Sequence, residues 1–452
     1  MPVVYDKITI KNFKSIKDVS VELGKLNVLI GPNGSGKTNF LEAVLLARTI
    51  VRPPSLPPYP FANWWGYQNL VFGRDVNNNV EFSVEGKAGD NVPFAYSFII
   101  NGAGDSVNFI QENLRIGDEL NFERSGPLLT IDNGKANRAQ KRARPDIADH
   151  YILQIKDNRY SIFSLIAQSL TESYDRYQDR FLAFYQNLLE SKSPVILAGR
   201  PEDLSAFDQL LQFFLNDVWF LSYDPGLAKA PLPPSSMLGV HGEGIASSLY
   251  SSYGATMPKG YLNDFLEEYK LSISYNLGPN QTVSLRLGEG SLQFDIPGVP
   301  DGYLKMITIL HVLDQKPSIL FIDEIENSLH LKLIELAISA FRSFPGKVVL
   351  TTHSPMVVDL VDPSELILFE KSGLSTVAKR IANPEGLKKR LAEDGLALSE
   401  SWLYGDLEEG LQRGYGEDRA ERLPALRGHA WPQVLQKGSR GIERTRDASE
   451  VR

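Results

Sequence analysis

Eight consecutive residues near the N-terminus have the composition and spacing of a phosphate-binding loop, G-x-x-x-x-G-K-[ST]. They are Gly31, Pro32, Asn33, Gly34, Ser35, Gly36, Lys37 and Thr38, followed by Asn39. Glycines let such a backbone curl so that successive N–H groups point at phosphate oxygens. The ammonium of Lys37 would then reach the β- and γ-phosphates, and the hydroxyl of Thr38 would be a ligand for Mg²⁺. The competing interpretation, a chance glycine-rich turn, is disfavoured by the apolar strand before the loop and the helix after it.

Two carboxylates follow a nearly continuous apolar run over 318–322, which is typical of a buried parallel strand. A carboxylate at the end of such a strand lies beside the phosphate loop, so Asp323 is predicted to hold Mg²⁺ through water. Glu324 is predicted to polarise the attacking water. The alternative is a solvated acidic turn, which the upstream loop makes less favourable. His330 follows closely and is predicted to have a positioning or interface role, because one histidine is a weak zinc signal.

A histidine follows the next buried-strand run, over 348–352. At that strand end the His353 side chain would point at the same crevice and hydrogen-bond the γ-phosphate or the attacking water. The alternative is a histidine that caps the next turn. His353 is therefore a catalytic candidate because of its position beside the other predicted groups.

The elements that must hold these residues follow from hydrophobic periodicity. We expect strands over 7–13, 19–23, 26–30, 318–322 and 348–351 and helices over 37–50, 303–313 and 331–341. Alternation of helix and strand in the final third implies a parallel sheet covered by helices. The expected fold class is α/β.

A second unit is predicted to interrupt the first. Five prolines within 51–60 end the first helix, and an α+β lobe is expected over 51–285. Its predicted elements are strands at 80–84 and 94–100, a helical face over 207–218, and a hairpin of 271–275 with 283–287. The head would comprise 1–50 and 286–385, with 386–410 packed on it. The Arg- and Gly-rich segment 411–452 is expected to be weakly ordered.

Composition limits the classes of function. The 452 residues carry a net charge of −8 and contain no cysteine. The missing cysteines exclude a disulfide framework, a thiolate zinc site and a cysteine nucleophile. No apolar run approaches the roughly 18–20 residues of a membrane span, and the N-terminus lacks an export signal. We therefore expect a cytoplasmic protein with no membrane partner.

One basic run is a candidate for contact with nucleic acid. It consists of Lys135, Arg138, Lys141, Arg142 and Arg144. These side chains could neutralise phosphates, but a solvated loop is an equally good interpretation. The acidic overall charge argues against a protein that coats nucleic acid.

The motifs together resemble the predicted ATPases related to RecF, SMC and the overcoming-lysogenization-defect proteins, which belong to the ABC-type ATPases. The resemblance is carried by ITIKNFKSI at 8–16, LNVLIGPNGSGKTN at 26–39, IDEIENSLH at 322–330, TTHSP at 351–355 and LYGDL at 403–407. The third segment is similar to the Walker B and D-loop region of the family. The fourth resembles its switch-histidine segment.

The resemblance implies a P-loop NTPase head of ABC type with a mixed sheet, an inserted lobe, and hydrolysis of ATP with Mg²⁺. Two copies would sandwich two ATP molecules and act in DNA repair and maintenance or in anti-phage defence. The family signature resembles Ser-Asp-Gly, whereas this chain has Pro300, Asp301 and Gly302. The serine hydroxyl is thus missing, but the N–H of Gly302 and the helix N-terminus could bind the partner's phosphate. Gln68 is a candidate for the glutamine lid by order alone, with a solvated loop residue as the alternative.

Other functions remain open. The chain could drive a separately encoded nuclease or toxin effector, or be a regulatory nucleotide-binding protein with little turnover. A nuclease domain of Toprim type is not indicated, because no strand followed by paired acids occurs after His353. A transporter's ATP-binding subunit is disfavoured by the large insert after the loop.

Overall fold

The computed structural model describes most of the chain. The described residues are 3–51, 61–89, 91–102, 106–118, 120–132, 150–155, 159, 161–162, 210, 217–234, 237–254, 256–403 and 407. Those up to Ser401 belong to one compact unit. The basic run at 135–144, most of the helical face over 207–218, and the segment 411–452 lie outside the described residues.

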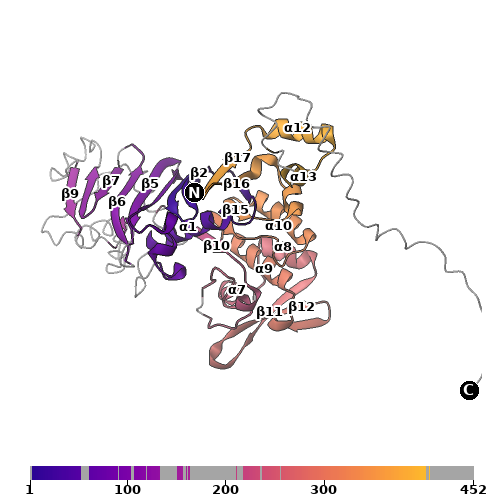
Figure 1. Cartoon of the computed structure of the whole chain (residues 1–452). Helices are drawn as coiled ribbons and strands as arrows, with labels where there is room; N and C mark the ends of the chain where they lie inside the picture. The colour runs from indigo at the N-terminus through magenta and orange to yellow at the C-terminus, as the bar shows by residue number, and fades with distance from the viewer. Residues whose placement is uncertain are drawn as a thin grey trace, which may run out of the picture. The chain divides into compact units, whose positions relative to one another are not determined.

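A six-stranded mixed sheet carries the predicted site (Figure 1). Its order is β10 (Val218–Leu221), β14 (Ile319–Ile322), β15 (Lys347–Thr351), β3 (Leu26–Ile30), β16 (Leu366–Ser372) and β17 (Ser375–Arg380). The first five strands are parallel, and β17 runs antiparallel to β16. The central strands are apolar runs buried along almost their whole length, as expected for strands covered on both faces. The predicted mixed α/β sheet is confirmed.

Helices predicted from periodicity form within one or two residues of their expected bounds. They are α1 (Lys37–Val51), α9 (Asp301–Asp314) and α10 (Leu331–Ser343). Phe40 of α1 packs edge-on against Phe369 of β16, with ring centroids 5.8 Å apart. Helix α9 packs against α10 and against α8 (Tyr261–Glu268). None of the helices in the described ranges is both long and apolar enough to cross a bilayer.

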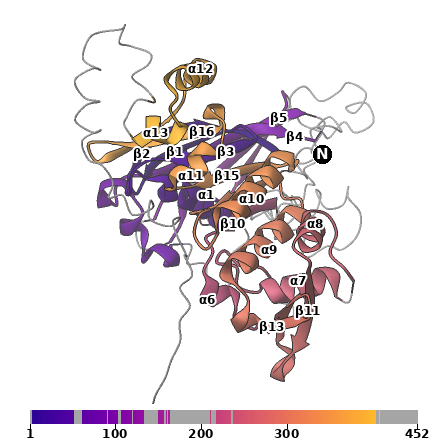
Figure 2. The same cartoon turned by 90° about the vertical axis from the view of Figure 1, so that its right-hand side faces the viewer.

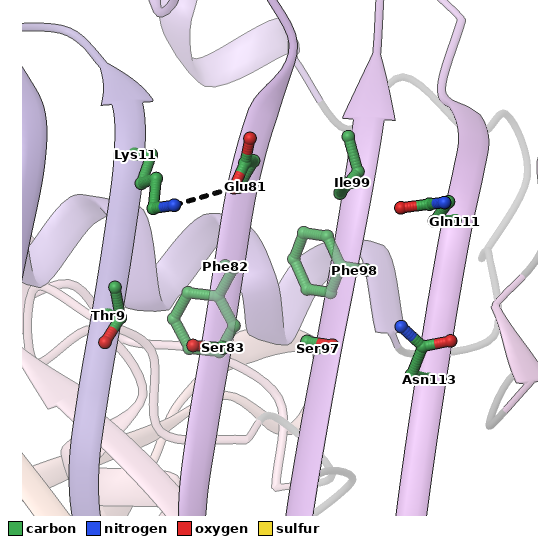
Figure 3. Close-up of a pocket in the computed structure, with 10 residues that line it drawn as sticks. All are labelled: Thr9, Lys11, Glu81, Phe82, Ser83, Ser97, Phe98, Ile99, Gln111 and Asn113. Atoms are coloured by element: carbon green, nitrogen blue, oxygen red, sulfur yellow. Dashed lines mark ion pairs between the residues drawn. The ribbon is translucent and has the colours of Figure 1, made fainter. Parts of the chain in front are cut away.

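The second sheet has eight antiparallel strands. They are β2 (Ile16–Glu22), β1 (Val4–Phe13), β4 (Val80–Ala88), β5 (Val92–Asn101), β6 (Asn108–Ile116), β7 (Leu120–Ser125), β8 (Leu128–Asp132) and β9 (His150–Gln154), in that order. Apolar residues alternate with polar ones, and the apolar face shares one buried core with α1. The opposite face has a shallow hollow over β1, β4, β5 and β6, beside an ion pair of Lys11 with Glu81 at 3.3 Å (Figure 3). No residue predicted to do chemistry lines that hollow.

The two sheets cross the predicted head–lobe boundary. Strand β1 of the predicted head pairs directly with β4 of the predicted lobe. In the same way β10, which lies within the predicted lobe, pairs with β14. Val218 is assigned by its pattern to a helical face, but it begins β10 instead. The segment Val218–Leu221 pairs in parallel with β14 and forms the edge of the sheet. The division into head and lobe stays a prediction.

The remaining elements include a third sheet, which lies beyond α8 and α9 from the six-stranded sheet (Figure 2). This sheet contains β11 (Leu271–Leu277), β12 (Val283–Glu289) and β13 (Leu292–Asp295). Its first two strands pair antiparallel, which confirms the predicted hairpin. Shorter helices are α6 (Pro225–Ala228), α7 (Ile245–Tyr253), α11 (Pro355–Asp359), α12 (Pro384–Asp394) and α13 (Leu398–Leu403). The backbone N–H and the hydroxyl of Ser399 both donate to the Asp359 carboxylate, at 2.8 and 2.7 Å.

Candidate functional site

The phosphate loop connects the end of β3 to the start of α1. Gly31, Gly34 and Gly36 have φ angles of +148°, +77° and +106°, which side-chain-bearing residues rarely adopt. A Cβ atom at Gly31 would overlap the carbonyl oxygen of Phe369, and one at Gly36 would overlap the Thr376 hydroxyl. Glycine is therefore required at both positions, because the loop lies directly against β16 and β17.

A chain of hydrogen bonds supports the loop on the side that faces β17 and the turn between β1 and β2. The Thr376 hydroxyl donates to the carbonyl oxygen of Ser35 at 2.8 Å and lies 2.8 Å from the Ser15 hydroxyl. The side-chain amide of Asn39 donates to the Ser15 hydroxyl at 2.7 Å. No sequence pattern marks the role of Ser15 or Thr376. Ser15 lies in the turn between β1 and β2, so this turn and β17, both distant from the loop in sequence, hold it in place.

Lys37 points back over the loop. Its Nζ donates to the carbonyl oxygens of Gly31 at 2.8 Å and Pro32 at 3.2 Å, and lies 3.5 Å from Nδ1 of His353. The residue is only 3% exposed. Burial lowers the pKa of Lys37 to about 8, although the carboxylates of Asp323, Glu326 and Glu324 act in the opposite direction. The ammonium thus lies where the phosphates of a nucleotide would need it.

The two predicted magnesium ligands meet at the carboxyl edge of the sheet. The Thr38 hydroxyl donates to Oδ1 of Asp323 at 3.3 Å, and the Thr351 hydroxyl donates to the same oxygen at 2.6 Å. Burial raises the pKa of Asp323, which the bond from Thr351 partly offsets. Among the described residues, no group of three or more acidic or histidine side chains is placed so that it could hold a metal ion. One carboxylate and one hydroxyl fit Mg²⁺, which keeps several waters and binds substrate phosphates.

Glu324 occupies a tight turn after β14. Its φ angle is +49°, and its N–H donates to the Thr351 hydroxyl at 2.8 Å. The side-chain amide of Asn327 donates to Oε2 of Glu324. The neighbouring Glu326 accepts a hydrogen bond of 2.6 Å from the N–H of His353. Thr351 and Glu326, which sequence analysis did not single out, therefore join the loops after β14 and β15.

The other predicted residues lie in different surroundings. Asp301 begins α9, and its Oδ1 lies 2.6 Å from Nζ of Lys229. A Cβ atom at Gly302 would lie 2.7 Å from the carbonyl oxygen of Ser328. Gln68 and His330 are exposed. No hydrogen bond or ion pair in the described part of the chain joins these four residues to the phosphate loop.

The chain is similar to known proteins over most of its length. Residues 26–359 match the family described as "AAA domain, putative AbiEii toxin, Type IV TA system". The OLD nuclease of Thermus scotoductus is 25% identical over 187 residues, which are 41% of this chain and 34% of that protein. The DNA replication and repair protein RecF of Magnetococcus marinus is 35% identical over 82 residues, 17% of this chain and 22% of that protein. The matched part thus spans about a third or less of each relative.

A solved structure covers a larger share of the chain. The Smc head bound to the C-winged helix domain of ScpA covers 85% of this chain and 99% of its own, with a TM-score of 0.43 and 13% identity.

Proposed function

This chain belongs to the AAA domain family that matches residues 26–359, and from that premise we propose that it binds ATP with Mg²⁺ and hydrolyses it to ADP and phosphate. The similarity to RecF and OLD sequences supports an ATPase of that kind. One observation carries the proposal: three strand ends meet, with Thr38 3.3 Å from Asp323 and Lys37 3.5 Å from His353. A turn with only a structural role would not require a lysine, a carboxylate and a histidine beside a glycine-rich loop.

The proposed roles follow from this geometry. Backbone N–H groups of the loop and the N-terminus of α1 bind the phosphates, and Lys37 neutralises the β- and γ-phosphates. Thr38 and Asp323 would hold Mg²⁺, which neutralises charge that develops on the phosphoryl group. Glu324 orients the attacking water, and His353 hydrogen-bonds the γ-phosphate. Thr351 fixes Asp323 and Glu324 relative to each other.

We further propose that two copies bind two ATP molecules between them. The N–H groups at the start of α9, at Asp301 and Gly302, would face the γ-phosphate bound by the partner. Pro300 contributes no hydroxyl there, so the helix N-terminus alone would make this contact. Hydrolysis would then separate the copies. By analogy with RecF, described as a DNA replication and repair protein, DNA is the proposed partner and the cytoplasm the proposed location.

The proposal is tested by Lys37→Ala. The variant is expected to lose ATP binding and phosphate release, because no other side chain offers a charge to the β- and γ-phosphates from within the loop. Lys389→Ala, at an exposed position of α12, is the matched control for loss of a lysine. Equilibrium titration with a fluorescent ATP analogue measures the difference. Equal affinity in Lys37→Ala and the unmutated protein would refute the assignment.

A second candidate is an ATPase that drives a separately encoded nuclease or toxin effector. It is favoured by the match to OLD nuclease, which is limited to 34% of that protein, and by the toxin in the family description. In this case the purified chain should hydrolyse ATP and leave supercoiled and linear DNA intact. Cleavage of either DNA by the chain alone would rule this candidate out.

A further inference from the structure

A lysine outside every recognised motif lies beneath the acidic turn. Lys305 is on the second turn of α9, and its side chain is fully buried, at 0% exposure. Its Nζ donates to the carbonyl oxygens of Glu324 at 2.9 Å, Ile325 at 3.1 Å and Asn327 at 2.8 Å. An ammonium has three N–H donors and no acceptor, so each donor has one acceptor here.

The position is costly for a charged residue. Residues 304 and 306–313 of the same helix are all buried, and most of them are apolar. An aliphatic side chain would fill this place without the desolvation of an ammonium. Burial lowers the pKa of Lys305 to about 8, while the carboxylates of Glu326, Glu324 and Asp323 raise it. The presence of a lysine at this position is explained if the carbonyl oxygens of the turn require its three N–H donors.

The turn has two residues in an unfavourable backbone conformation. Glu324 has a φ angle of +49° and Ser328 one of +65°. Side-chain-bearing residues keep such angles only where their surroundings hold them. Lys305 binds the carbonyl of Glu324 itself and that of Asn327, the residue before Ser328. Its hydrogen bonds therefore restrain both ends of the turn.

We propose that Lys305 is a positioning residue for ATP hydrolysis, which fixes the turn so that the Glu324 carboxylate faces the attacking water. The inference rests on the proposed function. Helix α9 also touches the turn at a second point, because Gly302 lies against the carbonyl oxygen of Ser328. A shift of α9 on binding of the partner's nucleotide at its start would thus also move the turn that holds Glu324.

The test compares variants of α9 in the full chain. Lys305→Met keeps an unbranched side chain and removes all three donors. Thr308→Val is the matched control, since Thr308 is also fully buried but donates within its own helix, to the carbonyl of Leu304 at 2.8 Å. We expect Lys305→Met to lower kcat by about a hundredfold, as a small misplacement of a reacting group does, with unchanged affinity for a non-hydrolysable ATP analogue. Thr308→Val should keep both quantities.

Lys305→Arg gives an independent measurement if the Met variant does not fold. It keeps charge and donors, but its planar fork cannot reproduce the three-carbonyl geometry, so its kcat should lie between those of the unmutated protein and Lys305→Met. A wild-type kcat in the folded variants would overturn the inference. So would a parallel loss of kcat and affinity, or an equal loss in Thr308→Val. Absence of turnover in the unmutated protein would instead refute the proposed function, and this inference with it.

Discussion

Nucleotide affinity should weaken as the pH rises from 7 to 9. Lys37 must be an ammonium to bind phosphate strongly, and burial lowers its pKa to about 8 in the free protein. A bound triphosphate adds negative charge beside the Nζ atom, so Lys37 stays protonated in the complex. Binding above pH 8 therefore takes up one proton.

The magnitude follows from this pKa. In the free protein the charged fraction of Lys37 falls from about 90% at pH 7 to about 10% at pH 9. The dissociation constant should consequently rise about tenfold over this range, with a limiting slope of about 1.4 kcal/mol per pH unit at higher pH. The dissociation constant must rise, and not fall, with pH, because the nucleotide binds the protonated form of Lys37 and this form is lost as pH rises.

The assay is an equilibrium titration with a fluorescent, non-hydrolysable ATP analogue and saturating Mg²⁺ at constant ionic strength. Lys37→Arg is the control, because a guanidinium stays charged over this range and its affinity should not depend on pH. Lys305 also has a pKa lowered to about 8. The slope should persist in Lys305→Met if Lys37 is its source. Constant affinity of the unmutated protein between pH 7 and 9 would refute the reasoning, as would an equal slope in Lys37→Arg.

Two further substitutions examine other parts of the site. Glu324→Gln keeps the size of the side chain but removes its base, so phosphate release should fall by about a hundredfold or more while ATP binding is retained. Size measurements should show the ATP-bound dimer accumulating in this variant, and a fully active monomer would contradict the assignment. Gly36→Ala should abolish nucleotide binding in the same titration, because the new Cβ would overlap the Thr376 hydroxyl at a φ angle of +106°. Gly34→Ala, where a Cβ meets nothing within 4 Å, should bind more tightly than Gly36→Ala, and the reverse order would refute the steric explanation.

The predicted residues that the fold brings together could be found from the sequence because each follows a local pattern. An apolar strand that ends in a glycine loop, an acidic pair or a histidine can be recognised without its neighbours. Parallel strands then bring those ends to one edge of the sheet. The order β14-β15-β3 has this effect for Asp323, His353 and the loop.

The supporting residues that no local pattern marks depend on contacts between segments distant in the chain. Thr376 supports Ser35 although 341 residues separate them, and it lies on an antiparallel edge strand that no motif marks. The pairing of β1 with β4 is likewise set by register across a sheet, which alternation along one strand does not fix. Lys305 did leave a signal. A lysine between Leu304 and Met306, within the mostly apolar stretch 304–313, is a buried charge that requires acceptors.

The hydrogen bonds divide the site into two supported parts. The phosphate loop is held by Thr376 of β17 and by Ser15 of the turn between β1 and β2. The loops after β14 and β15 are fixed together by Thr351 and Glu326, and Lys305 holds the loop after β14.

Between these parts, the two side-chain contacts found among the described residues are long. They join Thr38 to Asp323 at 3.3 Å and Lys37 to His353 at 3.5 Å. Both lie where Mg²⁺ and the terminal phosphates are proposed to bind. A bound nucleotide would replace weak contacts with charged ones, so its arrival and hydrolysis would alter the junction between the two parts more than either part itself.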